Sequence, residues 1–199
     1  MTKKIIALML LAVTLTACGG GGGTTTKTDA SGLGKFSMDF KTKAKTEVKK
    51  DFEVKKGVFL PLAINVDSKP IIRYIIELTD FEFDPNSSSA KPKDDKQTSI
   101  EIALFGDAGD TAETPLRVKT FEVAPPFAKV DEKYGKVSNV AVTIFKDGKT
   151  EETSLSYNAK GTVKINSVAG ETITGEVDLT QDDGAKIKGN FTAQMKKKK

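Results

Sequence analysis

The sequence contains neither histidine nor tryptophan, and Cys18 is its single cysteine. Without histidine there is no Ser-His or Cys-His pair for nucleophilic catalysis, and zinc sites built from histidine and cysteine are excluded as well. Because one cysteine cannot form an intramolecular disulfide, the fold depends on packing. Neither a P-loop nor a Gly-x-Gly-x-x-Gly motif occurs. We therefore predict a protein that is not an enzyme, has no catalytic residues and needs no cofactor.

A pair of carboxylates is the one catalytic arrangement that this composition leaves open. Glycosidases need only two Asp or Glu residues, and the chain has 27, so no pair can be singled out from the sequence. Besides the phenylalanines, only Tyr74, Tyr134 and Tyr157 offer an aromatic platform for a sugar. A hydrolase is the third and least favoured hypothesis, and it requires two carboxylates close together in a cleft.

The positive charge of the chain is concentrated at its two ends. Lys3 and Lys4 lie near the start, and 196–199 is a run of four lysines. Removing these six from the 31 basic residues leaves 25, against 27 acidic ones. A nucleic-acid binder needs a concentrated basic face. The remaining charge therefore predicts no nucleic-acid partner.

The first seventeen residues have the pattern of a removable secretory signal. Two lysines precede an apolar run over 5–15, which is broken only by Thr14 and followed by small residues up to Ala17. A bilayer-spanning helix needs about 20 apolar residues, so this run is too short for one. We expect 1–17 to be cleaved from the mature chain.

The stretch Leu15-Thr16-Ala17-Cys18 resembles the lipobox of bacterial lipoproteins, a Leu-x-Ala-Cys pattern. In that family the cysteine thiol takes a diacylglyceryl group, the peptidase cuts before the cysteine, and the new N-terminus is acylated with a fatty acid such as palmitate. The resemblance implies cleavage between Ala17 and Cys18, lipidation of Cys18, and attachment to a membrane of the bacterial cell envelope. Gly19, in place of aspartate, favours the outer membrane. The alternatives are an ordinary secretory signal with an incidental cysteine, or a short buried helix.

Composition divides the rest of the chain into three parts. Residues 18–34 are rich in glycine and threonine and contain Leu33 as the only large apolar side chain, which predicts a flexible tether. Residues 35–195 are long enough for a single domain with one core. The lysines of 196–199 form a basic tail that we expect to be solvated, with a weak contact to anionic lipid headgroups as the alternative.

Alternation of apolar and polar residues predicts β-strands along the whole domain. Phe36, Met38 and Phe40 share one face of the first strand. The further strand candidates lie at 48–54, 57–66, 70–78, 100–104, 116–123, 137–145, 152–157, 162–165, 173–179 and 187–195. Asp147-Gly148 is a strong hairpin signal between two of them. No amphipathic helix of ordinary length is apparent.

Two of these candidates carry an ambiguity. Pro61 within 57–66 indicates an edge strand or a bulge. In 70–78, four isoleucines also fit a helical stripe that Pro70 could begin, but the many β-branched residues favour a strand.

Nine to eleven short strands separated by turns predict an all-β fold, either an antiparallel β-sandwich or a β-barrel, with a C-terminal meander. The last forty residues also resemble the Gly-Thr-Val…Gly-x-Phe meanders of β-rich envelope lipoproteins of unknown function. That likeness implies a fold and no activity.

Calcium is the one metal that the sequence suggests, through Asp107, Asp110 and Glu113 in a glycine-containing loop. Oxygen ligands on a flexible loop suit Ca²⁺, although the spacing does not match an EF-hand. The favoured alternative is a solvated turn whose short polar side chains bind their own backbone, which leaves no metal site.

Two binding functions remain. The first is a non-catalytic interaction domain for another envelope protein, a polysaccharide or a host molecule. The second is a carrier of a small apolar or lipid-like ligand. A continuous internal cavity lined by Phe and Ile favours the carrier, whereas a filled core with an exposed apolar patch favours the interaction domain.

Overall fold

The computed structural model describes residues 32–86, 90–156 and 158–196. The segment Ser31–Lys199 is one compact unit that contains every described strand and both hydrophobic clusters. It therefore holds the complete core that a separately folding domain needs. The predicted signal peptide, Cys18 and most of the predicted tether lie outside the described residues.

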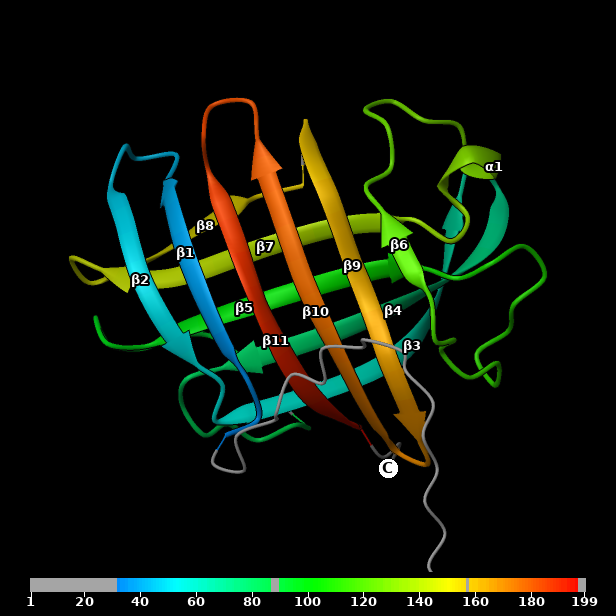
Figure 1. Ribbon diagram of the computed structural model, residues 1–199, viewed down its shortest axis with the longest axis horizontal. Helices are drawn as coiled ribbons and strands as arrows, with labels where there is room; N and C mark the ends of the chain where they lie inside the picture. The colour runs from blue at the N-terminus through cyan, green and yellow to red at the C-terminus, as the bar shows by residue number, and fades with distance from the viewer. Residues whose placement is uncertain (1–31, 87–89, 157, 197–199) are drawn as a thin grey trace, which may run out of the picture. The chain divides into compact units, whose positions relative to one another are not determined.

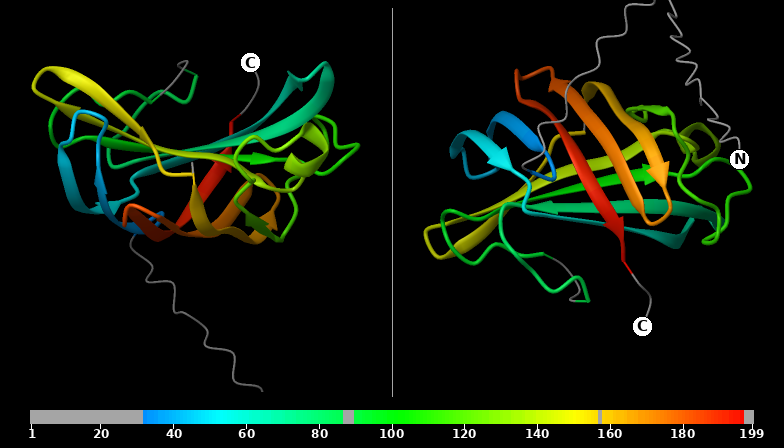
Figure 2. Two further views of the ribbon diagram at one scale, coloured as in Figure 1. Left: turned by 90° about the horizontal axis from the view of Figure 1, so that it is seen from above. Right: turned by 60° about the horizontal axis from the view of Figure 1, so that its bottom comes forward.

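The strands form two layers that cross each other, as Figure 1 shows. The first layer contains, in spatial order, β2 (Glu47–Glu53), β1 (Lys35–Lys41), β11 (Lys186–Met195), β10 (Thr172–Gln181), β9 (Ala159–Ala169) and β6 (Thr120–Glu122). The second contains β3 (Lys56–Val66), β4 (Lys69–Thr79), β5 (Thr98–Phe105), β7 (Val137–Lys146) and β8 (Lys149–Ser154). Figure 2 shows the two layers from other sides.

The layers join where β11 changes its neighbour. Along one edge, β11 pairs with β1 up to Gly189, and its last residues, Gln194 and Met195, pair in parallel with β3. The other neighbour of β11 is β10, which also pairs with β9. β2, β6 and β8 each pair with one strand only, so the sheet is open. The prediction of an antiparallel sandwich with a C-terminal meander is confirmed, and the barrel alternative is wrong.

The main core lies between the two layers. In β1, the side chains of Phe36, Met38 and Phe40 are buried and the intervening ones exposed, as the alternation predicted. The largest fully buried side chains come from both layers: Phe52, Phe59, Phe121, Met38, Ile76, Leu78, Ile100, Ile102, Leu104, Leu155, Ile165 and Ile173. Removing each of these side chains from water stabilises the fold by about 1.5–3 kcal/mol before entropy is counted.

The ambiguous segment 70–78 is a strand, β4, with apolar side chains on both faces. Ile72, Tyr74 and Ile76 face the main core. Ile71, on the opposite face, belongs to a small second cluster with buried Phe105 and Val130. Burial on both sides produces a nearly continuous apolar run instead of alternation, and this is why the same residues also fitted a helix.

The predicted edge position of Pro61 and the predicted hairpin turn are both confirmed. β3 pairs with β4 along its whole length but with β11 only at Val58 and Phe59, so Pro61 lies where the second neighbour has ended. Between β7 and β8, Asp147 and Gly148 have φ values of 51° and 76°. A positive φ at both central residues is what a type I′ turn requires.

The predicted strand over 116–123 is mostly wrong, because only its second half pairs: Thr120–Glu122 with β9, and Val123 with Val137 through an isolated bridge. Arg117 and Lys119 turn back to the preceding loop instead. The one described helix, α1 (Val130–Lys133), is a single turn. Among the described residues, no helix has the length and apolar character that crossing a membrane demands.

Candidate functional site

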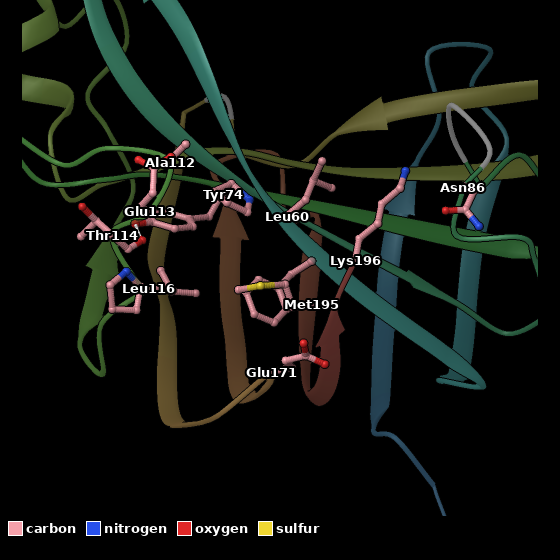
Figure 3. Close-up of a pocket in the computed structure, with 13 residues that line it drawn as sticks. Leu60, Tyr74, Asn86, Ala112, Glu113, Thr114, Leu116, Glu171, Met195 and Lys196 are labelled. Carbon is pink, nitrogen blue, oxygen red and sulfur yellow. Dashed lines mark hydrogen bonds between the residues drawn. The ribbon is translucent and has the colours of Figure 1, made fainter. Parts of the chain in front are cut away.

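A cavity of about 660 Å³ opens at the corner where β3 separates from β11. Figure 3 shows the side chains that line it, which come from β3, β4, the β4–β5 loop, the loop before β6, the β9–β10 turn and the end of β11. The lining residues are Phe59, Leu60, Pro61, Tyr74, Asn86, Ala112, Glu113, Thr114, Pro115, Leu116, Glu171, Met195 and Lys196. Pockets that enclose small molecules have volumes of about 300–1,000 Å³.

The walls of this cavity are mainly apolar and continuous with the core. Phe59, Tyr74 and Leu116 are themselves buried members of the main cluster, and Met195 and Ala112 pack against it. These side chains are fixed by the surrounding packing, so the cavity is largely preformed. A preformed apolar cavity suits the hydrocarbon or ring portion of a ligand.

Tyr74 links strand β4 to the loop that forms one wall. Its hydroxyl donates a hydrogen bond to the backbone carbonyl of Thr114, at 2.8 Å. Burial, with a smaller contribution from the charge of Asp110, raises the pKa of Tyr74 to about 12. The phenol therefore keeps its proton at neutral pH and remains a donor to the loop.

The wall loop begins at Gly106 and is tied to the second layer by its backbone. The amide of Gly106 donates to the carbonyl of Ile72 at 2.7 Å, and the carbonyl of Gly106 accepts from the amide of Gly135 at 2.9 Å. A Cβ on Gly135 would lie 2.5 Å from Oδ1 of Asp107, and the φ of Gly135 is +65°. The positive φ and this close contact favour a glycine where the loop approaches the rest of the fold.

Four charged side chains, Asp107, Asp110, Arg117 and Lys119, hold the base of this loop and form what we call the loop clamp. Arg117 donates to the carboxylates of Asp107 and Asp110, the latter at 2.7 Å. Lys119 donates to Asp107, also at 2.7 Å. The Lys119 hydrogen bond, followed by that of Arg117, lowers the pKa of Asp107. The side chain of Asp110 is only 5% exposed, so the guanidinium of Arg117 lies against a nearly buried carboxylate.

The three residues considered for calcium do not form one group. Asp107 and Asp110 belong to the loop clamp, where Arg117 and Lys119 already bind the oxygens that a cation would need. Asp110 also accepts a hydrogen bond from the amide of Asp107 at 2.8 Å, as expected for a turn that binds its own backbone. Glu113 instead lines the cavity. Within the described ranges, no group of three or more His, Cys, Asp and Glu side chains is placed to hold a metal ion.

Charged side chains lie at the rim of the cavity. Glu113 comes from the wall loop, Glu171 from the β9–β10 turn and Lys196 from the residue after β11. In Figure 3, Glu113 lies beside Tyr74, whereas Lys196 extends away from it on the other side. An apolar interior with a charged rim can hold an amphiphilic molecule with its polar end toward water.

A carboxylate pair lies on the outer face of the second layer. Glu77 and Glu101 are directly opposite each other in β4 and β5, and both line a smaller polar cavity of about 250 Å³. Burial, and then the charge of Glu101, raises the pKa of Glu77. Glu101 accepts a hydrogen bond from Arg73 at 3.3 Å. The hydrolase hypothesis requires such a pair of carboxylates. The sequence could not identify this one, because Glu77 and Glu101 become neighbours only through the register of β4 and β5.

The apolar cavity was also missed, since its lining comes from six separate segments of the chain. The apolar run in 57–66 and the alternation in 187–195 predicted the two strands but gave no sign that their ends diverge. Comparisons with protein families, with curated proteins and with solved structures found no match, so the chemistry of the site itself must support the functional conclusion.

Proposed function

We propose that this chain is a lipid-anchored protein of the bacterial envelope, and that its β domain binds a small apolar or lipid-like molecule without catalysis. The observation that carries this proposal is the cavity of about 660 Å³ between the layers. A carrier was expected to hold its ligand in a continuous internal cavity, but the main core fills most of the space between the layers. The ligand site proposed here is instead the cavity at the corner between β3 and β11.

The composition of the lining supports binding of an apolar molecule. Leu60, Pro61, Leu116 and Met195 present aliphatic or thioether groups, and Phe59 adds an aromatic surface. The hydroxyl of Tyr74 is already used by Thr114, so it does not make the interior polar. Burying apolar ligand surface against such walls contributes about 25 cal/mol per Å².

Native mass spectrometry of Ser31–Lys199, purified gently from its host, tests this proposal. We expect a bound small molecule whose mass is lost on denaturation. In a cavity-filling variant, Ala112→Trp, the adduct should disappear, because Ala112 lines the cavity. The matched control is Ala63→Trp, which places the same side chain at an exposed position of β3. A bare mass for the unmodified segment, or an adduct that survives Ala112→Trp, contradicts the proposal.

The anchor rests on the residues around Cys18 alone, which lie outside the described part of the chain. Labelling cells with radioactive palmitate should mark the full-length protein, and Cys18→Ala should remove the label and release the protein from the membrane fraction. Membrane attachment that persists in Cys18→Ala contradicts a lipid anchor.

A protein-binding function is the second candidate, because one large apolar side chain is almost fully exposed. Phe127 is 93% exposed and follows Pro125-Pro126, and its φ is +61°. A phenylalanine in the left-handed region is unusual, and an exposed aromatic side chain is a common contact in protein interfaces. A photo-crosslinking residue at 127 should capture one defined envelope protein in cells, whereas one at exposed Leu62 should not.

A further inference from the structure

Strand β8 lies at a border of the second layer, where it pairs with β7 alone (Figure 1). The sheet has two other border strands, β2 and β6. β6 has only three residues. β2 turns the side chain of Lys50 inward, and its ammonium group donates to Asp80 and Thr98. A very short strand and an inward-pointing charge both discourage pairing with another chain, so these two borders are protected.

On the inner face of β8, two side chains have a buried polar atom without a hydrogen-bond partner. The atoms are Oε2 of Glu151 and Oγ1 of Thr153, and the residues opposite them in β7 belong to the main core. In the described part of the chain, Nε of Arg73 is the one further side-chain atom of this kind, and it lies in an interior strand. A buried polar atom that has lost water without gaining a partner destabilises a fold. Glu151 therefore differs from Lys50, whose inward-pointing charge has its partners.

The hydrogen-bonding pattern of the β7–β8 hairpin determines which backbone groups of β8 can pair with another strand. The amide of Leu155 donates to the carbonyl of Val140 in β7 at 2.7 Å. The bonding direction alternates along an antiparallel strand, so residues 150, 152 and 154 direct their N–H and C=O groups away from β7. These groups lie on the open side of β8.

We propose that two copies of this chain associate through β8, paired antiparallel about a two-fold axis at Glu152, so that Glu151 of each copy lies opposite Thr153 of the other. Residue 150 then forms the backbone ladder with residue 154 of the second copy, and Glu152 with its counterpart. The pairs of Glu151 with Thr153 lie between these, where opposing side chains are closest. Each Thr153 hydroxyl can donate to a Glu151 carboxylate across the axis, so all four unpartnered atoms gain a partner.

The two unpartnered side chains select this register. A shift of two residues in one direction places Glu151 opposite its own copy, and the same shift in the other direction places Thr153 opposite its own copy. A shift of one residue would turn the inner face outward. The selected pairing is self-complementary, as a two-fold dimer requires. It has one cost, because the exposed side chain of Glu152 meets a like charge at the axis.

Sedimentation velocity of Ser31–Lys199 over a hundred-fold range of concentration measures this association. We expect a monomer–dimer equilibrium that strengthens with added salt, because salt screens the repulsion between the two Glu152 carboxylates. Glu152→Gln should lower the dissociation constant about two- to five-fold. Thr153→Val should raise it about ten-fold, because both hydrogen bonds to Glu151 are lost. The same substitution should raise the unfolding temperature of the dilute monomer, in which this hydroxyl has no partner.

Disulfide crosslinking tests the register. Ser31–Lys199 contains no cysteine, so Glu152→Cys introduces a single thiol. At the axis the two Cα atoms are about 5.5 Å apart, which suits a disulfide, and mild oxidation should link the copies. The matched control is Thr150→Cys, an exposed position on the same strand. Its counterpart in the second copy lies four residues along the ladder, about 14 Å away, so this variant should stay unlinked.

Three results would overturn the proposal. They are a monomer at every concentration, a dimer whose dissociation constant Thr153→Val leaves unchanged, and equal crosslinking of Glu152→Cys and Thr150→Cys. None of them affects the proposed ligand site, because β8 contributes no residue to the lining of the apolar cavity.

Discussion

The hydroxyl of Tyr74, on strand β4, donates a hydrogen bond to the carbonyl of Thr114 at a distance of 2.8 Å. These residues lie 40 positions apart in the chain, and both line the cavity. Together with the backbone hydrogen bond from Gly106 to Ile72, this contact fixes the wall loop to the second layer, so the shape of the cavity depends on it.

Tyr74→Phe should loosen this wall while preserving the core. The carbonyl of Thr114 loses its donor, and we expect the free energy of unfolding to fall by about 1 kcal/mol. Because folding raises the pKa of Tyr74 to about 12, the wild type should also lose stability between pH 10, where the unfolded phenol ionises, and about pH 12. Urea unfolding of both proteins across this pH range checks both effects. If the free energy of unfolding of Tyr74→Phe falls as steeply with rising pH as that of the wild type, the assignment to Tyr74 is contradicted.

Arg117→Met should lower the free energy of unfolding, because the nearly buried carboxylate of Asp110 loses a charged partner. Lys49→Met is the control, since the ion pair of Lys49 with Asp39 is long, at 3.9 Å, and both side chains are exposed. Its effect should be near zero. Urea denaturation midpoints of the two variants provide the comparison, and equal midpoints would show that the loop clamp contributes nothing.

The contribution of Asp107 to the loop clamp should depend on pH in a defined direction. Its pKa is lowered in the folded protein, so the stabilisation is complete above the unfolded value of about 3.9 and is lost as the pH falls through the folded pKa. The stability difference between wild type and Asp107→Asn should therefore shrink below about pH 4. A difference that stays constant into strong acid contradicts this assignment.

Glu77→Gln should increase stability at neutral pH. Burial and the charge of Glu101 raise the pKa of Glu77 in the folded protein. Above this folded pKa, the ionised carboxylate destabilises the fold. Well below the pKa of the unfolded chain, Glu77 is protonated in both states and the cost is absent. Like charges directly opposite in a sheet cost about 0.2–1 kcal/mol, and we expect a gain of this size. Thermal unfolding at pH 7 and at pH 3 tests it: the gain should be present only at pH 7.

Gly189→Ala should destabilise the pairing of β1 with β11 through a direct clash. A Cβ at Gly189 would lie 2.2 Å from the carbonyl oxygen of Lys35 and 2.6 Å from the ring of Phe36, its cross-strand partner. We expect a loss of about 1–3 kcal/mol. Gly148→Ala provides the comparison, because that turn has open space and only a positive φ, with a cost of about 1 kcal/mol. Calorimetric unfolding of both variants should rank Gly189→Ala as the more damaging.

The sequence predicted the strands well wherever one face is buried and the other is solvated. The alternation of Phe36, Met38 and Phe40 and the turn at Asp147-Gly148 are local signals, and local signals can be interpreted without the fold. They were less decisive in β4, where both Ile71 and Ile72 are buried, because a strand covered on both faces loses its alternation.

The functional features depend on long-range arrangement and could not be predicted in the same way. The segment 116–123 has the composition of a strand, yet Arg117 and Lys119 form ion pairs with carboxylates of the preceding loop. These ion pairs can form only when the loop is folded, so the sequence pattern does not reveal them. The cavity similarly results from the divergence of β3 and β11. The choice between an open and a closed sheet was undetermined for the same reason.

Binding of a neutral apolar probe is the measurement that tests the central claim most directly. Titration of Ser31–Lys199 with N-phenyl-1-naphthylamine should give a saturable rise in fluorescence, with about one probe bound per chain. Ala112→Trp should abolish the rise, and Ala63→Trp, which adds the same side chain outside the cavity, should preserve it. No saturable binding, or binding that Ala112→Trp leaves unchanged, would contradict a ligand site between the two layers.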